Sequence, residues 1–223
     1  MQDSEATKRY FEKTAVSFDS LYKEEDRLWY YVNRVFRRAL YERVHLTVNE
    51  MEGLHDFSVL DVGCGSGRNS VIFVRAGARQ VVGIDFAESM VGLAKQYSSA
   101  NGVASQCEFV LGDALIYPFQ RKFDIVVALG VFDYVGEPAA LLRRMAELAS
   151  HKVIAGFPAY TPIRGTQRKV RYWMKGCPLY FQSPKQLRAL CCEAGLDEYH
   201  LVPCGGAGNL LVAKVDGCRS TGR

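Results

Sequence analysis

The sequence predicts an α/β fold, namely a doubly wound, mostly parallel sheet of seven strands with a reversed last strand and an N-terminal helical lid. Short apolar runs rich in β-branched residues alternate with helical patterns, which is typical of a parallel sheet covered by helices on both faces. The first of these runs ends in glycines at positions 63, 65 and 67. The last two runs follow each other without a helix and therefore indicate an antiparallel pair at one sheet edge.

The first 52 residues precede the first expected strand and have helical patterns. Over residues 1–22, Tyr10 and Phe11 begin an aromatic series that ends at Tyr22, with the spacing of an amphipathic helix. A second helical pattern covers residues 26–50. These helices have no strand beside them, so we interpret residues 1–52 as a lid that folds over a ligand, with a plain outer layer as the alternative.

From residue 58 onwards, strands and helices are expected in regular succession. The expected strands are 58–62, 80–84, 107–111, 123–128, 152–156, 197–202 and 208–215. The expected helices between them are 68–76, 88–98, 137–149 and 184–194. The last helix has clear limits, because Ser183 suits the N-cap, Pro184 the first helical position and Gly195 the C-terminal cap. Residues 158–182 break the alternation and form an insertion rich in Pro, Gly, Arg and aromatic residues.

Composition indicates one folded domain, 1–223, without a metal site. Apolar residues make up 48% of the 223 positions and charged residues 23%, which is ordinary for a globular protein. No apolar run reaches the roughly 20 residues of a transmembrane helix, and the polar, acidic N-terminus is unlike a secretory signal. We therefore expect a cytoplasmic protein whose seven cysteines are free thiols, since they have neither C-x-x-C nor zinc-type spacing.

The glycine turn at residues 63–67 is the clearest candidate for a binding site. A buried strand that ends in glycines and leads into a helix leaves backbone N–H donors open to a ligand, and a side chain there would hold the ligand away. In open parallel sheets, ligands bind beyond the carboxyl ends of the strands. The strand ends to consider are 63–68, 85–90, 112–115, 129–134 and 157–162.

Four of these strand ends carry motifs by which the chain, over about residues 10–215, resembles the class I S-adenosylmethionine-dependent methyltransferases. Asp61 followed by G-x-G-x-G is similar to the first motif, and Asp85 to the acidic residue that holds the ribose hydroxyls. Gly112-Asp113-Ala114 resembles the third motif, whose Asp contacts the adenine amine, and the segment 129–134 occupies the fourth. The resemblance implies S-adenosylmethionine as the cofactor. The cofactor-binding residues are then Asp61, Gly63, Cys64, Gly65, Gly67, Asp85, Phe86, Met90, Gly112, Asp113, Ala114, Leu129 and Gly130.

The chemistry of these residue types agrees with that cofactor, although some of the residues also suit purely structural roles. A carboxylate such as Asp85 can accept hydrogen bonds from two ribose hydroxyls, and the cationic sulfonium is favoured near Asp61. The flat adenine suits Phe86 and Met90, but ordinary core packing accounts for these two side chains equally well. A turn cap is the alternative role of Asp113.

Two other functions use the same pattern. A nicotinamide-dependent oxidoreductase also needs a glycine loop and an acidic residue after the second strand, but its G-x-G-x-x-G fingerprint requires glycine at position 68. Position 68 is Arg, and the third glycine is Gly67. The other alternative is a non-catalytic partner protein that binds S-adenosylmethionine without transferring the methyl group.

The acceptor is less clearly indicated than the donor. Methyl transfer requires mainly that the acceptor atom is aligned with the methyl group, and a base helps when the acceptor is a hydroxyl. Candidate catalytic residues are Asp133, Tyr134 and Tyr22, and Asp133 is a base, an orienting group or a helix cap. The Asn/Asp-Pro-Pro-Tyr motif of DNA amino-methylases is missing from the fourth strand end, so a nucleic-acid acceptor is not expected.

The insertion 158–182 is expected to shape the acceptor site, with Tyr160, Arg164 and Arg168 as substrate-binding residues. No acidic residue occurs between Glu147 and Glu193, although the net charge of the chain is only +4. The cations favour an anionic acceptor. Contact with a membrane surface or with RNA, or a basic amphipathic helix whose aromatic side chains pack inwards, are alternatives.

Within the methyltransferases, the chain also resembles the magnesium-protoporphyrin O-methyltransferases. The shared features are the Tyr10-Phe11 segment and Phe132-Asp133-Tyr134, where those enzymes have Ile-His-Tyr. This resemblance implies O-methylation of a small anionic molecule, and small-molecule O- or N-methyltransferases of other kinds remain open. The sequence does not indicate an oligomeric state.

Overall fold

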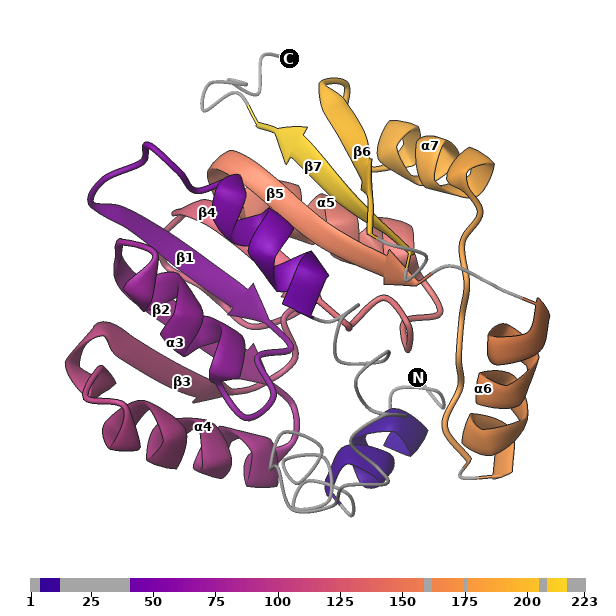
Figure 1. Cartoon of the computed structure of the whole chain (residues 1–223), viewed down its shortest axis with the longest axis horizontal. Helices are drawn as coiled ribbons and strands as arrows, with labels where there is room; N and C mark the ends of the chain where they lie inside the picture. The colour runs from indigo at the N-terminus through magenta and orange to yellow at the C-terminus, as the bar shows by residue number, and fades with distance from the viewer. Residues whose placement is uncertain (1–4, 13–40, 159–161, 175, 205–207, 216–223) are drawn as a thin grey trace.

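The computed structural model describes residues 5–12, 41–158, 162–174, 176–204 and 208–215, and they form an α/β fold around one seven-stranded sheet (Figure 1). Its strands are β1 (Phe57–Val62), β2 (Ala78–Asp85), β3 (Cys107–Leu111), β4 (Phe123–Leu129), β5 (Ala149–Pro158), β6 (Tyr199–Pro203) and β7 (Gly208–Lys214). Their order across the sheet is β3-β2-β1-β4-β5-β7-β6. Only β7 runs antiparallel to its neighbours β5 and β6. The predicted sheet with its reversed last strand is therefore confirmed.

Helices cover both faces of this sheet, as expected for a doubly wound fold. They are α3 (Arg68–Arg75), α4 (Glu88–Ala100), α5 (Pro138–Leu148), α6 (Pro162–Met174) and α7 (Pro184–Glu193), with a short 3-10 turn η1 (Ala104–Gln106). Residues 5–12 and 41–49 are also helical. We call residues 5–12 the N-terminal helix. Helices α5 and α7 pack on one face, whereas α3 and the helix of residues 41–49 pack on the other.

The core lies on both sides of the sheet, because successive strand residues point to opposite faces. In β1, Leu60 and Val62 contact the α5 side, and Val59 contacts the α3 side. All six residues of β1 are buried, which is why a central parallel strand has a continuous apolar sequence rather than an alternating one.

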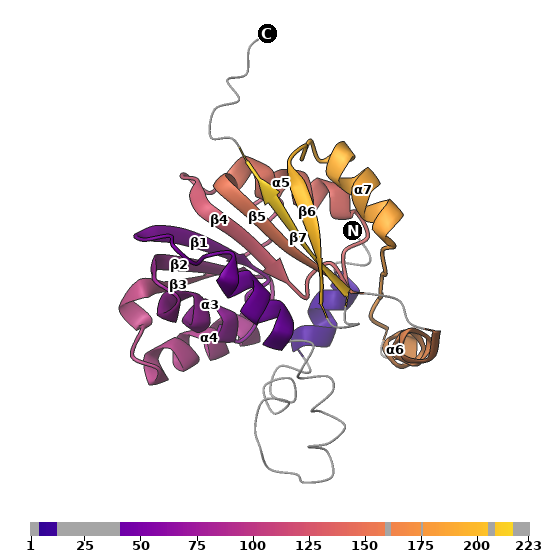
Figure 2. The same ribbon diagram turned by 45° about the horizontal axis from the view of Figure 1, so that its top comes forward.

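The parallel strands end at a common edge of the sheet, and the N-terminal helix packs there (Figures 1 and 2). The predictions for residues 13–40, including most of the expected lid helices, lie outside the described residues. The insertion contains a regular helix, α6, which lies beside the N-terminal helix and outside the two helix layers (Figure 2). Helix α7 begins with the predicted cap: the Ser183 side chain accepts from Gln186 N, and the Gln186 side chain accepts from Ser183 N.

Candidate functional site

The glycine loop after β1 is held against the end of β2 by backbone hydrogen bonds. Gly63 N and Cys64 N both donate to Ile84 O, at 2.8 and 3.1 Å. Gly63, Gly65 and Gly67 all have positive φ, at 65°, 52° and 75°, a conformation that only glycine adopts without strain. Helix α3 then begins after Gly67 without a side-chain cap. The first turn of α3 therefore lies directly beside the loop, and the role of its N–H groups as donors to a ligand stays a prediction.

The three glycines are needed for different reasons. A Cβ on Gly63 would lie 2.4 Å from Val131 Cγ2, and a Cβ on Gly67 would lie 2.9 Å from Ala94 Cβ. At these two positions, the absence of a side chain allows neighbouring residues of the protein to pack closely on the loop. A Cβ on Gly65 would meet no atom within 4 Å. Gly65 is therefore the point where the loop faces open space and where a ligand can approach the backbone.

Asp85 connects the end of β2 to the glycine loop. Its Oδ2 accepts a hydrogen bond from Gly65 N at 2.9 Å, and its Oδ1 accepts one from Ala87 N at 2.9 Å. The carboxyl is 9% exposed. Burial raises its pKa, and the two amide donors oppose that rise. Each oxygen keeps a second lone pair, so Asp85 can accept ribose hydroxyls and hold the loop at once.

Asp61 is the most deeply buried carboxyl of the site, at 1% exposure. Its Oδ2 accepts a hydrogen bond of 2.6 Å from Ser70 Oγ on α3. Burial raises its pKa to about 7, the Ser70 hydroxyl lowers it, and the nearby Asp85 carboxylate raises it further. Asp61 is therefore poised to ionise near neutral pH, and a cation beside it would favour the ionised form.

Cys64, predicted at the cofactor, directs its side chain into the core. It is 5% exposed and clusters with Val91, Ala94 and Phe109. A Cβ on Gly83 would lie 2.9 Å from Cys64 Sγ, so a glycine in the middle of β2 makes room for this thiol. Burial raises the pKa of Cys64 well above its usual value, which keeps the thiol protonated and unsuited to be a nucleophile.

The third motif forms a tight turn beyond β3. Gly112 N donates to Asp85 O at 3.0 Å, which ties this turn to the ribose-binding candidate. Asp113 is exposed, and its Oδ1 accepts from Leu115 N at 2.9 Å. The turn-cap alternative for Asp113 is thus confirmed, whereas its contact with adenine stays a prediction. Ala114 is 9% exposed and packs in the main core.

The fourth strand end meets α6 and the N-terminal helix in an aromatic cluster of Tyr10, Phe11, Tyr134 and Tyr172. The Tyr134 and Tyr172 hydroxyls are 3.1 Å apart. The Phe11 ring is 5.2 Å from the Tyr134 ring and 6.4 Å from Phe86. The cluster therefore joins two predicted site residues, Tyr134 and Phe86, and adds Tyr172, whose role the sequence did not indicate.

Asp133 is also buried at this strand end, at 5% exposure. Its backbone carbonyl accepts from Tyr180 N at 2.8 Å. Glu137 is the N-cap residue of α5, so the helix-cap role of Asp133 is wrong for that helix. Leu129 and Gly130 are half-buried beside it, and Gly130 has a φ of 83°. The role of Asp133 as a base or orienting group stays a prediction.

Glu12 is a contact that sequence reasoning missed. From the N-terminal helix, Glu12 Oε1 accepts from Glu88 N at 2.7 Å and Oε2 accepts from Ser89 N at 3.4 Å. The Ser89 side chain is the largest cause of the lowered pKa of Glu12, and the two backbone amides lower it further. A carboxylate from a distant segment thus caps α4 beside Asp85. The nearby Met90 is 3% exposed and packs with Ala87, so the core-packing alternative holds for it.

Four predicted residues cannot be placed. Tyr22 and Tyr160 lie outside the described residues. Arg164 and Arg168 belong to α6 by their backbone, but their side chains also lie outside what the structure describes. The substrate-binding role of Tyr160 and the two arginines, and the catalytic role of Tyr22, stay predictions.

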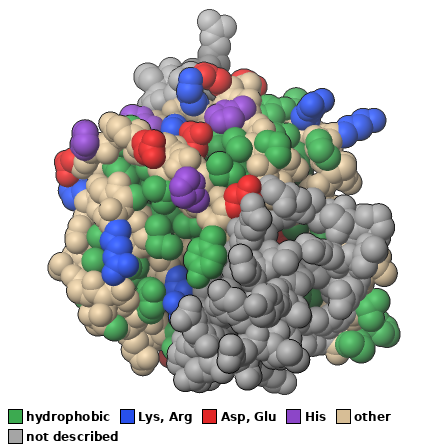
Figure 3. Space-filling model, viewed as in Figure 1, with side chains coloured by type: hydrophobic (Ala, Val, Ile, Leu, Met, Phe, Trp, Pro, Cys, Tyr) green, Lys and Arg blue, Asp and Glu red, His purple; other side chains and the backbone are tan. Residues whose placement is uncertain are grey.

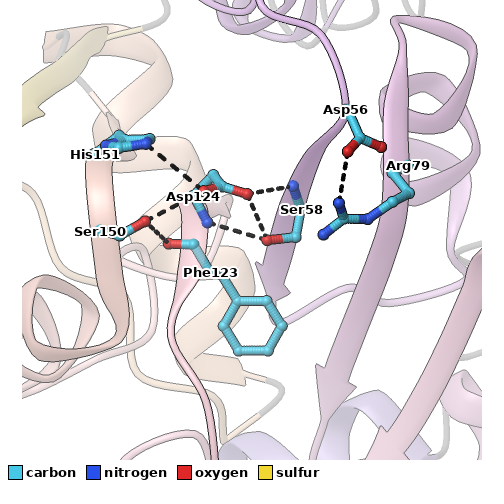
Figure 4. Close-up of polar contacts among 7 residues, drawn as sticks. All are labelled: Asp56, Ser58, Arg79, Phe123, Asp124, Ser150 and His151. Atoms are coloured by element: carbon cyan, nitrogen blue, oxygen red, sulfur yellow. Dashed lines mark hydrogen bonds and ion pairs between the residues drawn. The ribbon is translucent and has the colours of Figure 1, made fainter.

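The opposite end of the sheet holds a Ser/His/Asp group that is structural. Asp124 Oδ2 accepts from Ser58 N at 2.7 Å and from Ser58 Oγ at 2.8 Å, and its Oδ1 faces Ser150 Oγ at 3.3 Å and His151 Nε2 at 3.7 Å (Figure 4). A catalytic triad needs the imidazole between the hydroxyl and the carboxylate, whereas here the carboxylate is central. Ser58, Asp124 and Ser150 therefore fasten β1, β4 and β5 together.

Within the described ranges, no three metal-binding side chains come together, and no helix is long and apolar enough to cross a membrane. The cysteines in these ranges are free thiols.

Comparison with known proteins agrees with this site. A family described as a methyltransferase domain matches residues 59–152. The ubiquinone biosynthesis O-methyltransferase of Pseudoalteromonas translucida is 34% identical over 164 residues, which cover 69% of each chain. That of Neisseria meningitidis serogroup C is 30% identical over 150 residues, covering 62% of this chain and 63% of the relative. The alignments thus span about two thirds of the relatives' own length.

Among solved structures, the magnesium protoporphyrin IX methyltransferase from Synechocystis PCC 6803 with bound SAH has a TM-score of 0.78 at 23% identity, covering 96% of this chain and 100% of that one. At this identity, the likeness shows that the two chains have the same fold.

Proposed function

Because the chain belongs to the family of S-adenosylmethionine-dependent methyltransferases, we propose that it methylates an oxygen atom of a small anionic molecule. Its cofactor, S-adenosylmethionine, supplies a methyl group that the positive sulfonium has already activated. Both curated relatives are named O-methyltransferases, which supports oxygen as the acceptor atom. Family membership also decides against the nicotinamide-dependent alternative. The free thiols support the cytoplasm as the proposed compartment.

One observation carries the proposal: the glycine loop contacts the segment that follows β4 and contains Tyr134. Val131 packs so closely on Gly63 that a Cβ there would overlap it. Residues that follow β1, which suit the donor, therefore adjoin residues that follow β4, which suit the acceptor. Such contact allows the reacting atoms to be aligned, and alignment supplies much of the rate in a reaction whose donor is already activated.

Each residue then has a defined task. Asp85 holds the loop and the ribose, and Asp61 faces the cationic part of the cofactor. When the acceptor is a hydroxyl, its proton would pass to the Asp133 carboxylate, or through the Tyr134 hydroxyl to solvent, as the O–CH₃ bond forms and the bond between the methyl carbon and the sulfonium sulfur breaks. When the acceptor is a carboxylate, no base is needed, and Tyr134 orients the oxygen. Arg164 and Arg168 would pair with the negative charge of the acceptor.

The test begins with the purified chain, methyl-labelled cofactor and a metabolite extract. We expect label in a small product, and the type of bond identifies the acceptor: mild alkali releases methanol from a methyl ester but not from a methyl ether or amine. Cofactor binding measured by calorimetry, together with no labelled product, would instead favour the non-catalytic partner protein.

Once a product is known, Tyr134→Phe tests the acceptor side. Loss of a general acid–base or orienting hydroxyl should lower kcat about a hundredfold and leave the cofactor Kd unchanged. Tyr199→Phe is the matched control, because Tyr199 lies on β6 and packs against the main core. Equal activity of the two variants would contradict the role of Tyr134.

A further inference from the structure

Helix α6 exposes apolar side chains that the methyltransferase site does not use. Trp173 is 79% exposed, Met174 69% and Val170 51%. The hydrophobic side chains at the lower right of Figure 3 lie where Figure 1 has the C-terminal end of α6. Large apolar side chains that are exposed together on one helix suit an interaction site.

The same helix is basic along its whole length. Its sequence, Pro162–Met174, contains Arg164, Arg168, Lys169 and Arg171 and no acidic residue. Lys169 is exposed, and its Nζ lies 5.8 Å from the centre of the Phe181 ring. Lys169, Val170 and Trp173 line one cavity of about 370 Å³ with Cys177, Pro178 and Leu179. The patch thus combines the Lys169 cation with exposed apolar groups.

The inner face of α6 is fixed to the rest of the molecule. Tyr172 is 7% exposed, packs against the Tyr10 ring at 5.5 Å and meets the Tyr134 hydroxyl. The outward direction of Trp173 and Met174 is therefore set by the packing of Tyr172, because neighbouring helical residues point about 100° apart. The patch is therefore exposed on a helix whose other face is already packed against the rest of the molecule.

We propose that the outer face of α6, formed by Lys169, Val170, Trp173 and Met174, binds the surface of an anionic lipid bilayer. A basic helix with Trp and aliphatic side chains on one face lies in the bilayer interface, where apolar groups leave water and cations meet lipid phosphates. RNA is a poorer match, because two of the three apolar side chains, Val170 and Met174, cannot stack on bases. Membrane binding is a function in addition to methyl transfer. It would bring the segment after β4, which contains Tyr134, close to acceptors that are dissolved in the lipid.

The experiment uses the full chain and vesicles of phosphatidylcholine with or without phosphatidylglycerol. We expect cosedimentation with the anionic vesicles that weakens as salt is added, and weak binding to neutral ones. In Trp29→Phe, Trp173 is the remaining tryptophan, and its emission should shift to the blue on binding. Trp173→Ser should weaken partitioning about tenfold, and Lys169→Ala about fivefold.

Matched controls lie elsewhere on the surface. Ile116 is 80% exposed beyond β3, and Lys95 is exposed on α4, so Ile116→Ser and Lys95→Ala should partition as the unchanged chain does. Calorimetry with S-adenosylmethionine reports whether each variant is folded. Equal binding to neutral and anionic vesicles, equal losses in the control variants, or binding to single-stranded RNA without binding to vesicles would overturn the proposal.

Discussion

Two buried carboxyls, Asp61 and Asp85, lie close enough for Asp85 to raise the pKa of Asp61, yet they have different hydrogen-bond donors. Asp85 receives two backbone amides, whereas Asp61 receives one hydroxyl, from Ser70. Amide donors favour the ionised form, and burial opposes it. Burial raises the pKa of both carboxyls, to about 7 at Asp61. A cationic ligand beside Asp61 would offset this effect and favour its ionised form.

This effect predicts how cofactor affinity changes with pH. Because the pKa of Asp61 is raised to about 7, the folded chain without ligand loses stability as the pH rises through that value. A cation held by Asp61 binds the ionised form, so affinity should fall about tenfold per pH unit below about pH 7. Calorimetric titrations with S-adenosylmethionine between about pH 6 and about pH 8 measure this change of affinity with pH.

Asp61→Asn is the control for that experiment. The Asn variant should bind more weakly, and the ratio of the two affinities should grow as the pH rises. The cofactor's own ionisation is the same for both proteins and cancels in this ratio. A ratio that does not change with pH would mean that Asp61 does not face the cation.

At the scale of elements, the N-terminal helix is attached to the sheet by one carboxylate and one aromatic cluster. Glu12 accepts from the first N–H groups of α4, and Tyr10 and Phe11 pack on Tyr172 and Tyr134. In our proposal, the first attachment lies at the strand end that binds the cofactor and the second at the strand end that binds the acceptor. This position agrees with the predicted lid, whose movement stays a prediction.

Removing the carboxylate should loosen this helix. Glu12→Ala deletes a helix cap worth about 1 kcal/mol, so amide exchange in residues 5–12 should rise about fivefold. Exchange at Glu88 and Ser89 should rise as well, because these amides lose their acceptor. Hydrogen-exchange mass spectrometry measures both segments. Glu5→Ala on the same helix is the control, since Glu5 is exposed and its carboxylate is not part of this cap. An equal rise in both variants would contradict the role of Glu12.

The sequence predicted the helices and strands better than it predicted the side-chain contacts between them. Strand and helix limits follow from local patterns, and Ser183 begins α7 as its cap chemistry requires. Strand β5 is longer than expected, at Ala149–Pro158, because pairing with β4 begins at Ala149 and pairing with β7 continues to Pro158. Tyr172 could not be predicted as a site residue, since it meets Tyr134 across 38 positions of sequence. No local pattern encodes such a meeting.

At the scale of the whole molecule, the two ends of the sheet have different tasks. The carboxyl ends carry glycines at positive φ, exposed turns and the aromatic cluster, which suit ligand binding. At the amino ends, Asp124 joins β1 to β4 and β5 through Ser58 and Ser150. Burial tends to raise the pKa of Asp124, but these hydrogen bonds outweigh burial and the pKa is lowered.

Asp124→Asn should therefore destabilise the fold without affecting the site. Replacing the charged acceptor of several hydrogen bonds costs about 2 kcal/mol, which lowers the Tm of a chain this size by about 4–8 °C. Calorimetric unfolding measures the loss, and the Kd for S-adenosylmethionine should not change. Asp56→Asn is the control: Asp56 and Arg79 form an exposed pair, with 72% and 53% of their side chains accessible, and such pairs contribute less than about 1 kcal/mol.

The pH dependence of the stability of Asp124→Asn gives a second test, in which the direction of the change is predicted. Since the folded pKa of Asp124 lies below its ordinary value, its contribution is complete above the pKa of the unfolded chain and is lost as the pH falls through the folded pKa. The difference in Tm between the unchanged chain and Asp124→Asn should hold at neutral pH and shrink below about pH 4. A difference that persists in acid, or a variant that binds cofactor weakly at unchanged Tm, would show that Asp124 does not fasten the strands.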